Sequence, residues 1–577
     1  MPKVVAISIN NGVIVVAPPV DLLYWGLGIA PLALLLVTLV VLRWQAHEAA
    51  SVGMFAAVLV GLTAYQTPLR DIAVASGKGV WDAVFVLYVI IPALIFYHII
   101  DRANGFDALR EEVKSVTSNE LFLVLGFGWV FVSFMQSISG FGTPIVVVAP
   151  ILLALGVKPV YSVVIPLVGH AWANTFGTLG VAWLALDSTV ELQAVLLTAA
   201  AAGVLLWVVN LAGGLTVAWI FGRKQAVKYA LPMIALVSLI HGGGQLLGIF
   251  VWEPAFANFM AATLGLLALP VLAKWDPYAD TTDDIDVRPA MRDDMSSVSP
   301  TGSGTVATDG GVATEMDAIA PDDLMDLKLA LLPFGVLAAI AFLTAVIDPL
   351  AAALNTVQAG LSFPAVETGF GVANGAAAPY APFTPLTHPG TLLLASTAVA
   401  YAVYKRKGYF DTDTGTEESL TRSVLETAIP ASVAVISFLV MAKVMDNTGQ
   451  TLVLAQGIAN VATPASYGFL SPLIGSLGAF MTSSNTASNI LFSGLQQETA
   501  TSLGGLSENW ILGGQTTGGA IGNAISPGNV ILGTSAVGIV GKEGEVLRRT
   551  IPWVAAVAAI VGLLIVLFNA VGFLGVA

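Results

Sequence analysis

The chain consists of long apolar runs separated by short polar stretches, and most of the apolar runs are about 20 residues long. A helix of this length crosses the ~30 Å hydrocarbon core of a bilayer. The pattern therefore predicts an all-α polytopic membrane protein with about 12 transmembrane helices. We place these helices at residues 22–43, 49–65, 80–100, 160–186, 192–221, 229–249, 253–273, 327–347, 386–404, 423–445, 510–540 and 551–575.

Two further apolar segments, residues 119–157 and 465–500, have a polar centre. Each contains two apolar arms of roughly 15 residues, which is short for a span. We predict that both are re-entrant hairpins that return to the side from which they start. Irregular backbone at membrane depth is tolerated where it lines a watered cavity or is buried in protein. The small polar residues at the tips therefore indicate a site, or else they only permit close helix packing.

The two hairpins also resemble each other in sequence. Phe-Met-Gln-Ser at residues 134–137 is matched by Phe-Met-Thr-Ser at residues 480–483, which is 346 positions later. Asp101 is matched by Asp446 at a spacing of 345 positions. Two sequence matches with nearly the same spacing along the chain indicate a duplicated unit. We therefore divide the chain into an N-terminal segment, a first membrane half, a linker and a second membrane half, at residues 1–21, 22–273, 274–326 and 327–577.

The composition supports a lipid-facing surface and sets the linker apart. Of the 577 residues, 56% are hydrophobic and 10% are charged, against roughly 25% charged in soluble domains. The formal net charge is −14, but 13 acidic and 2 basic residues lie between Asp276 and Asp326. Low hydrophobicity with high charge predicts a disordered, solvated linker. A regulatory or partner-binding segment is the alternative.

The basic residues predict the orientation of the chain. If both hairpins return to their starting side, the short loops carry 17 Lys and Arg residues on one side and 3 on the other. The positive-inside rule then places both termini outside and the acidic linker in the cytoplasm. The first hairpin enters from the cytoplasmic side and the second from the external side. An inverted-topology repeat with broken helices is typical of an alternating-access secondary transporter, here of the cell membrane.

Each hairpin is followed by a span that polar residues and glycines interrupt, at residues 169–180 and 514–529. Helix N-termini at such breaks carry free amides and a positive dipole end, which suit a carboxylate. Unwound carbonyls can hold a cation. We therefore predict a substrate site formed by Ser137, Ser139, Gly140, Gly142, Thr143, His170, Asn174, Thr175, Ser483, Ser484, Asn485, Thr486, Thr516, Thr517, Asn523 and Ser526.

Some ionisable residues within or near the spans have two interpretations. His170 either binds a carboxylate or relays a proton, or it is a neutral histidine hydrogen-bonded at the helix break. For His241 we favour a packed neutral histidine. Lys443 and Asp446 lie near the end of a predicted span, where end-capping or snorkelling is the simpler role.

No enzyme signature is present. The chain has no cysteine, which excludes disulfides and thiolate chemistry, and it has no phosphate-binding Gly-Lys-Ser or Gly-Lys-Thr loop. We predict that the protein is not an enzyme and uses no cofactor, metal or nucleic acid. An ion gradient is the remaining energy source, with the proton as coupling ion and sodium as the alternative.

Four motifs together carry a resemblance to a known family. They are Ser-Gly-Phe-Gly-Thr-Pro at 139–144, Phe-Gly-Thr-Leu-Gly at 176–180, Ser-Asn-Thr-Ala-Ser-Asn at 484–489 and the stretch 519–543. With these motifs the chain resembles the L-lactate permease family from about residue 20 to the C-terminus. The resemblance implies import of lactate, and often glycolate, with a co-transported proton.

The resemblance also extends to a wider group of ion-coupled carboxylate transporters. In that group, Ser-Asn-Thr hairpin tips hold substrate and sodium, and Ser484, Asn485 and Thr486 match this triplet. The first hairpin has Ser-Gly-Phe at residues 139–141 instead, so the match does not extend to a symmetric pair of sodium sites.

Our leading hypothesis is a secondary importer of small monocarboxylates that acts by proton symport among membrane lipids. A sodium-coupled dicarboxylate transporter and a passive anion channel are the alternatives, and a membrane enzyme ranks last. A homodimer stays open as an alternative to a monomer.

Overall fold

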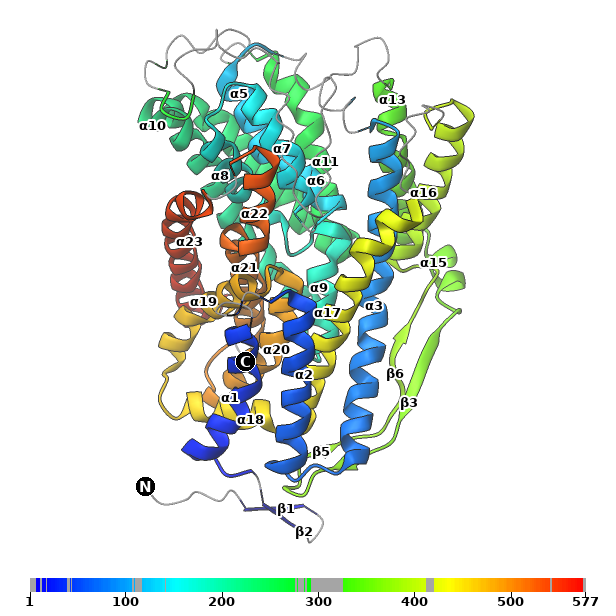
Figure 1. The fold of residues 1–577 in the computed structure, drawn as a ribbon, viewed down its shortest axis with the longest axis vertical. Helices are drawn as coiled ribbons and strands as arrows, with labels where there is room; N and C mark the ends of the chain where they lie inside the picture. Colours follow the sequence, from blue (N-terminus) through cyan, green and yellow to red (C-terminus); the bar gives the residue numbers. More distant parts are fainter. Residues whose placement is uncertain are drawn as a thin grey trace.

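The computed structural model describes most of the chain. It covers residues 7–10, 13–16, 18–38, 42, 44–105, 108, 117–140, 142–275, 278, 285, 288–291, 325–410, 420–539 and 542–573. Helices dominate this part of the protein (Figure 1). Seven of the described helices are long and apolar enough to cross a membrane. A helical membrane protein is therefore the right class, while the predicted number of about 12 spans stays a prediction.

Several predicted spans are single helices that overlap the expected positions, although two of them begin 11 and 8 residues earlier than predicted, at Leu69 and Glu543. They are α1 (Leu22–Leu36), α2 (Ala46–Thr63), α3 (Leu69–Arg102), α11 (Pro254–Ala273), α16 (Pro389–Arg406), α17 (Leu420–Asn447) and α23 (Glu543–Val571). The predicted span at 327–347 is divided into α13 (Leu327–Ala330) and α14 (Leu332–Val346). The two spans predicted between residues 192 and 249 form α10 (Val195–Val251), whose helical geometry breaks at Gly222 and Arg223.

Both hairpins consist of two helical arms. In the first, α5 (Glu120–Leu125), the π-helical segment η2 (Gly126–Phe131) and α6 (Val132–Ile138) lead to α7 (Thr143–Ala154). In the second, α19 (Pro464–Thr482) leads to α20 (Asn485–Leu503), and each of these arms has 19 residues. The predicted arm length of roughly 15 residues is therefore wrong for both arms of the second hairpin and for the first arm of the first hairpin, Glu120–Ile138, which also has 19 residues. In the second hairpin, α20 continues through polar positions such as Gln496 and Thr499.

Both interrupted spans are broken by a short 3₁₀ turn. In the first half, α8 (Pro159–Gly169) and α9 (Gly177–Thr189) flank the turn η3 (Ala171–Ala173). In the second half, α21 (Glu508–Gly522) and α22 (Pro527–Ala536) flank the turn η6 (Asn523–Ile525). Pro527 has no amide hydrogen for the preceding helix and is well suited to start a new one. The second break is therefore narrower than the predicted 514–529, since α21 is continuous through Thr516 and Thr517.

The same order of elements occurs twice along the chain. A long helix, a hairpin, a broken helix and another long helix follow one another from α3 to α10, and again from α17 to α23. The long helices that open the two series, α3 and α17, pack side by side (Figure 1). The two hairpins approach the middle of the molecule from the upper and lower parts of the same view.

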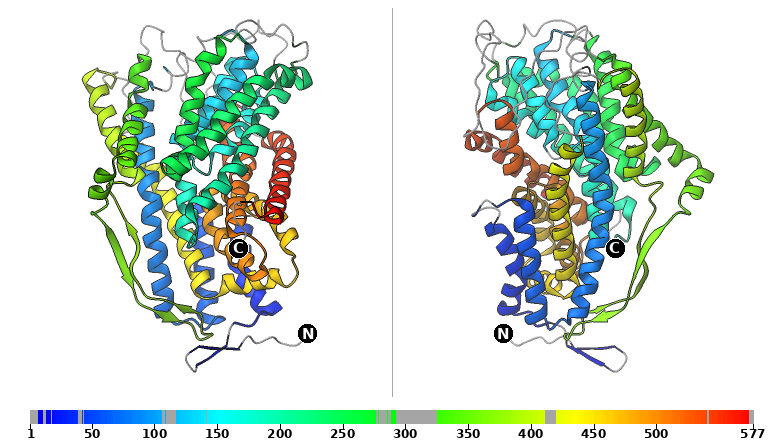
Figure 2. Two further views of the ribbon diagram at one scale, coloured as in Figure 1. Left: turned by 180° about the vertical axis from the view of Figure 1, so that it is seen from behind. Right: turned by 45° about the vertical axis from the view of Figure 1, so that its right-hand side comes forward.

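Short strand pairs that the sequence pattern does not predict accompany the helices. Between α15 (Asp348–Leu354) and α16, the strand β3 (Ala359–Phe363) pairs with β6 (Ala377–Phe383), and β4 (Val366–Glu367) pairs with β5 (Ala373–Asn374). A third pair joins β1 (Ile7–Asn10) to β2 (Val13–Val16). The β3–β6 ribbon runs beside α3 (Figure 2), where Trp81 Nε1 donates a hydrogen bond of 3.0 Å to the carbonyl of Ala381.

Part of the predicted acidic linker is packed rather than solvated. Tyr278, Ile285, Ala290 and Met291 are all buried, and the amide of Lys158 donates to the carbonyl of Ala290 at 2.8 Å. The prediction of a disordered linker therefore does not extend to these residues. Residues 292–324, which carry much of the rest of this segment, lie outside the described residues.

The packing of α8 against η2 leads to a stability prediction. A Cβ atom on Gly169 would lie 1.8 Å from the carbonyl oxygen of Gly128, so Gly169→Ala must push two backbones apart. Overpacking of this kind costs about 1–3 kcal/mol, and we expect a lower thermal unfolding temperature of the purified protein. The matched control is Gly126→Ala in the same π-helical segment, where the nearest atom is Leu269 Cδ1 at 3.7 Å. Equal unfolding temperatures for the two variants would contradict the prediction.

Candidate functional site

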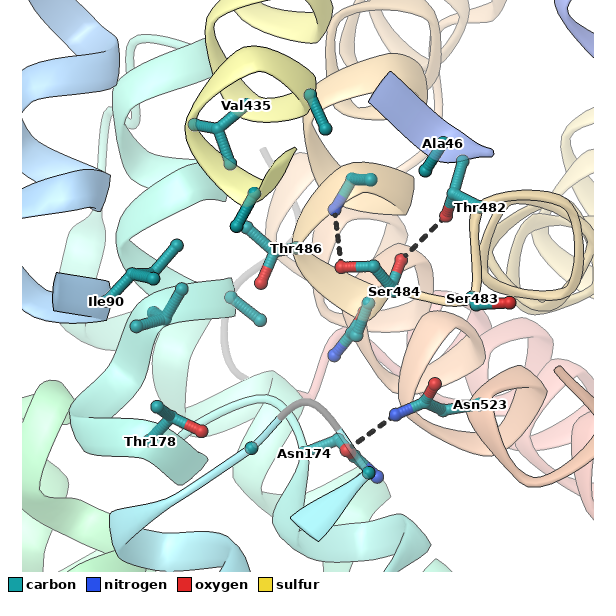
Figure 3. Close-up of a pocket in the computed structure, with 18 of the residues that line it drawn as sticks. Ala46, Ile90, Asn174, Thr178, Val435, Thr482, Ser483, Ser484, Thr486 and Asn523 are labelled. Carbon is teal, nitrogen blue, oxygen red and sulfur yellow. Dashed lines mark hydrogen bonds between the residues drawn. The ribbon is translucent and has the colours of Figure 1, made fainter. Parts of the chain in front are cut away.

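A cavity of about 280 Å³ lies where the two hairpin tips meet the two broken helices (Figure 3). Both hairpin tips, the break between α8 and α9 and the break between α21 and α22 contribute to its wall. The remaining wall comes from the N-terminal end of α2, the middle of α3 and the middle of α17. Segments from both halves of the chain therefore surround one space.

The tip of the second hairpin presents the start of a helix to this cavity. Ser483 adopts a left-handed conformation with φ of 55°, and its Oγ accepts a hydrogen bond of 3.0 Å from the amide of Gly528. Ser484 is the N-cap of α20, and its Oγ accepts from the amide of Ala487 at 3.2 Å. The first amides of a helix have no intrahelical acceptor. Within the described chain, the amides of Asn485 and Thr486 have no other acceptor either.

The tip of the first hairpin is different, because its amides are used within the turn. Gly142 is the N-cap of α7 with φ of 82°, a left-handed conformation that glycine adopts without strain. The amide of Thr143 donates to the carbonyl of Gly140 at 3.2 Å, and that of Ile145 donates to Gly142 at 3.0 Å. Pro144 has no amide hydrogen to offer. The start of α7 is therefore a weaker anion site than the start of α20.

A chain of asparagine side chains connects the two helix breaks. Asn529 Nδ2 donates to Asn523 Oδ1 at 2.9 Å, and Asn523 Nδ2 donates to Asn174 Oδ1 at 2.8 Å (Figure 3). Asn174 Nδ2 in turn donates to the carbonyl of Ala171 at 3.1 Å. All three side chains line the cavity. Each amide in the chain is thereby held in one orientation, and the two halves of the protein are joined at the cavity.

A second polar cluster supports the tip of α20, and Asn485 is the one member of this cluster that also lines the cavity. Thr516 Oγ1 donates to Thr175 Oγ1 at 3.1 Å, and Thr175 Oγ1 donates to the carbonyl of Thr516 at 3.1 Å. Asn485 Nδ2 donates to Thr175 Oγ1 at 3.2 Å, and Asn489 Nδ2 donates to Thr516 Oγ1 at 2.9 Å. This cluster fixes the first turn of α20 against α21 and the first helix break.

The structure brings most of the predicted site residues to the cavity wall. These are Gly140, Gly142, His170, Asn174, Ser483, Ser484, Asn485, Thr486 and Asn523. The other predicted residues lie behind the wall: Ser137, Ser139, Thr143, Thr175, Thr516, Thr517 and Ser526. The hydroxyls of two of these serines are hydrogen-bonded to backbone carbonyls. Ser137 Oγ donates to the carbonyl of Phe134 at 2.6 Å, and Ser526 Oγ donates to the carbonyl of Asn523 at 3.0 Å. Substrate contact by any of these residues stays a prediction.

Several lining residues were not predicted. Gln136, Gly177, Thr178, Thr482 and Asn529 lie within the polar stretches already singled out. The sequence offered no signal for the wall that α2, α3 and α17 contribute, because its members Ile90, Val435 and Phe438 resemble any other apolar residue of a span. Tertiary packing alone decides which of these residues face the cavity.

The backbone is strained where α9 begins at the cavity. Thr178 and Leu179 both have φ of 50°, and Gly180 has φ of 73°. Residues other than glycine adopt this left-handed backbone conformation at a cost of order 1–3 kcal/mol. Residues strained in this way concentrate at functional sites. Thr178 Oγ1 also lies 2.5 Å from the position that a Cβ on Gly140 would take. The first hairpin tip and the start of α9 therefore approach as closely as they do only because residue 140 is glycine.

The cavity has a polar wall and an apolar wall, and it holds few ionisable groups. Amides and hydroxyls of the tips and breaks face the apolar side chains of Ile90, Val435 and Phe438. The lining includes two histidines, His47 and His170, and no Lys, Arg, Asp or Glu among the described residues. An anion in this cavity would therefore rely on helix amides and dipoles rather than on a side-chain cation.

His170 and His241 have packed positions. His170 is 1% exposed, and its Nδ1 contacts the carbonyl of Pro166, as expected for a histidine hydrogen-bonded at the helix break. His241 is fully buried, lies 4.7 Å from the ring of Trp172 in a stacked arrangement, and is hydrogen-bonded through Nδ1 to Asn210. The packed interpretation of His241 is confirmed.

Comparison with known proteins identifies the family to which the chain belongs. The L-lactate permease family model matches residues 27–572. The chain belongs to the L-lactate permease family. Among curated relatives, the glycolate permease GlcA of Escherichia coli K12 is 26% identical over 568 residues, which cover 94% of this chain and 96% of the relative.

Two L-lactate permeases match this chain with similar sequence identity and coverage. That of Salmonella typhimurium LT2 is 28% identical over 546 residues, covering 90% of this chain and 91% of the relative. That of Halalkalibacterium halodurans is 24% identical over 534 residues, covering 91% and 92%. The family consists of permeases rather than enzymes, and together with the apolar helices it identifies an integral membrane transport protein.

Proposed function

We propose that the protein imports L-lactate and related small monocarboxylates such as glycolate by proton symport, as an alternating-access secondary transporter. The observation that carries this proposal is the cavity itself, where one helix N-terminus with unused amides faces amide and hydroxyl side chains. The names of the relatives, L-lactate permease and glycolate permease, give the substrate class.

The substrate carboxylate is proposed to bind at the start of α20. The free amides of Asn485 and Thr486 point from a helix N-terminus, where the dipole adds about half a positive charge. The Ser484 hydroxyl accepts from Ala487 and keeps its own hydrogen for the substrate. The 2-hydroxyl group would then meet the asparagine chain around Asn523, and the methyl group of lactate would meet Phe438.

The same geometry favours monocarboxylates over dicarboxylates. A second carboxylate would need its own set of donors, because an unpaired buried charge is very costly. The start of α7 has few free amides, since Thr143 and Ile145 already donate within the turn. The described lining also offers no Lys or Arg. The dicarboxylate alternative therefore has less support than the monocarboxylate proposal.

The repeated order of elements supports alternating access. The two hairpins approach the middle of the molecule from its upper and lower parts in Figure 1, as expected for an inverted repeat with one hairpin on each side of the membrane. With the distribution of basic residues, this arrangement supports a cell-membrane protein with both termini external.

One observation favours sodium as the alternative coupling ion. The oxygens Asn485 Oδ1, Asn489 Oδ1 and Thr517 Oγ1 are buried between α20 and α21 without a hydrogen-bond partner in the described chain. Neutral oxygens of this kind can coordinate a hard cation. Because the family resemblance implies a proton, we retain sodium as the second candidate to be separated by experiment.

The deciding experiment is uptake of labelled L-lactate into proteoliposomes that contain the full-length protein. We expect accumulation when the interior is alkaline, no response to an inward sodium gradient alone, and faster entry into vesicles preloaded with lactate. An excess of glycolate should compete, whereas the same excess of succinate should not. Accumulation that follows sodium would favour the sodium-coupled alternative, and flux without counterflow would favour a channel. Absence of uptake and counterflow under every gradient would refute the proposal.

A further inference from the structure

A buried ion pair lies outside the cavity, between the two long helices that open the repeats. Asp82 of α3 is 0% exposed, and its Oδ2 lies 3.3 Å from Nζ of Lys443 on α17. The hydroxyl of Tyr380 on β6 donates to the same oxygen at 3.0 Å. The predicted snorkelling of Lys443 at a span end is therefore wrong, because its side chain is 11% exposed and paired with Asp82.

Lys443 also holds the end of a helix that lines the cavity. Its Nζ donates to the carbonyls of Ser188 and Thr189, each at 3.0 Å, in the last turn of α9. These carbonyls have no intrahelical donor, and the negative end of the helix dipole attracts a cation. The first turns of α9 carry Thr178 and Val181 in the cavity wall. The helix α9 therefore connects the ion pair, at its C-terminal end, to the cavity, at its N-terminal end.

Asp82 has an oxygen that nothing in the described chain satisfies. Its Oδ1 is buried without a hydrogen-bond partner, although buried polar atoms nearly always have one. Asp71, near the start of α3, is the other buried carboxylate among the described residues, and its Oδ2 is also buried without a hydrogen-bond partner. Asp82, 11 residues further along α3, differs from Asp71 by its ion pair with Lys443. An ionisable group buried in the membrane region, with a free acceptor atom, is by default a functional candidate.

The other ionisable groups around this pair come from several elements. Lys78 lies one turn before Asp82 on α3, with Nζ 5.4 Å from the centre of the Tyr380 ring. Asp446 lies one turn after Lys443 on α17 and is exposed, and Glu498 of α20 interacts electrostatically with it. His388 at the start of α16 packs edge-on against Phe85 and Tyr88. From α9 the pair meets backbone carbonyls.

We propose that Asp82 binds the co-transported proton and that Lys443 transmits the change to α9; this inference rests on the proton symport proposed above. A proton from the external side binds Oδ1 of the Asp82 carboxylate and gives a neutral carboxylic acid. Lys443 keeps its own proton, and its charge is no longer neutralised by Asp82. A buried ammonium without a counter-charge is strongly disfavoured, so the arrangement that holds α9 becomes less stable.

The reverse step returns the proton. Lys443 turns toward the exposed Asp446 while α9 is released, and it comes back when α9 returns to the position described here. Re-formation of the ion pair favours ionised Asp82, which gives up its proton for release on the cytoplasmic side. One proton and one carboxylate anion then move together in each cycle, and no net charge crosses the membrane.

The test replaces Asp82 in the full-length reconstituted protein. Asn in D82N keeps the size of the side chain and can still accept from Tyr380, but it cannot take up a proton. We expect accumulation driven by the pH gradient to fall about tenfold or more, while lactate counterflow stays close to that of the unmodified protein. The matched control is D71N, which neutralises another buried carboxylate of α3 and should keep gradient-driven accumulation.

A double variant separates coupling from a purely structural ion pair. D82N/K443M removes both charges, so no buried charge is left unpaired. If the pair only stabilises the fold, this variant should recover gradient-driven accumulation together with thermal stability, and that result would overturn the inference. We expect recovery of stability, with counterflow retained as in D82N, but no recovery of accumulation.

The movement of α9 gives a second readout, because the chain has no cysteine that would interfere. A single cysteine in S188C should react faster with an external membrane-impermeant thiol reagent in the protonated state than in the ionised state. The comparison is made at one external pH between S188C alone and S188C/D82N, which mimics protonated Asp82. Faster labelling in S188C/D82N is expected, and equal rates would contradict transmission to α9.

The outcomes distinguish this inference from the proposed function. If the unmodified protein shows neither gradient-driven accumulation nor counterflow, the proposed function fails. If the unmodified protein shows both and D82N accumulates lactate equally well over the same pH range, only the role of Asp82 fails.

Discussion

A Gly519→Ala variant is expected to lose most of its lactate uptake and counterflow while it remains folded. A Cβ at this position would lie 2.0 Å from Asn485 Oδ1, 3.0 Å from Asn485 Cγ and 3.4 Å from Ser488 Oγ. No side chain accepts a contact as short as the first, so the Asn485 side chain must move. This residue begins α20, lines the cavity and is held by its hydrogen bond to Thr175.

The expected loss follows from the precision that the anion site requires. Moving Asn485 breaks a buried hydrogen bond and shifts the amides that are proposed to bind the carboxylate. Loss of one good hydrogen bond to a charged group costs about 1.5–3 kcal/mol, which corresponds to about a 10- to 100-fold weaker affinity. The measurement is the concentration of lactate that gives half-maximal counterflow in proteoliposomes, accompanied by the thermal unfolding temperature.

Gly494→Ala is the matched control for this prediction. Gly494 lies in α20, and the nearest atom to a Cβ there is Thr451 Cγ2 at 3.9 Å. Alanine is favoured over glycine inside a helix, so this variant should be at least as stable as the unmodified protein and transport normally. Normal counterflow in Gly519→Ala would show that the position of Asn485 is unimportant for the substrate.

The parts of the site that could be predicted from sequence are those where polar residues interrupt apolar spans. Ser484 and Asn174 are conspicuous because a serine or an asparagine amid apolar helix formers needs hydrogen-bond partners. The same reasoning placed Thr516 and Thr517 too close to a break, because hydroxyls are also tolerated inside a continuous membrane helix. Their partners, such as Thr175 and Asn489, come from other elements and are not visible in the local sequence.

The features that sequence reasoning missed depend on contacts between distant segments. The β3–β6 ribbon is formed by a stretch rich in Gly, Ala and Pro without a clear alternation of polar and apolar residues. Phe438 faces the cavity and Phe96 does not, yet both are apolar residues within long helices. Lys443 was placed at a span end by its position along the chain, whereas its burial is decided by Asp82, which lies in the other half of the repeat.

A charge at the start of α20 gives the sharpest test of where the carboxylate binds. Ser484→Asp should nearly abolish lactate uptake, although aspartate is as good an N-cap as serine and can still accept from Ala487. The new carboxylate would occupy the positive end of the helix dipole and repel the substrate. Two like charges about 4 Å apart repel by about 4 kcal/mol at an effective dielectric constant of about 20, which weakens binding about 1,000-fold.

Ser484→Asn is the control that isolates charge from shape. Asparagine has nearly the same size as aspartate, caps a helix equally well through Oδ1 and adds no charge. Its Nδ2 hydrogens replace the hydroxyl hydrogen that Ser484 offers to the substrate, so this variant should retain lactate counterflow within a few fold and unfold at a similar temperature. Half-maximal counterflow concentrations of the two variants, measured side by side, give the effect of the charge alone. Because Ser484 lies beside the amides of Asn485 and Thr486, a carboxylate bound there must respond to the charge. Similar affinities for lactate in the two variants would place the substrate carboxylate elsewhere in the cavity.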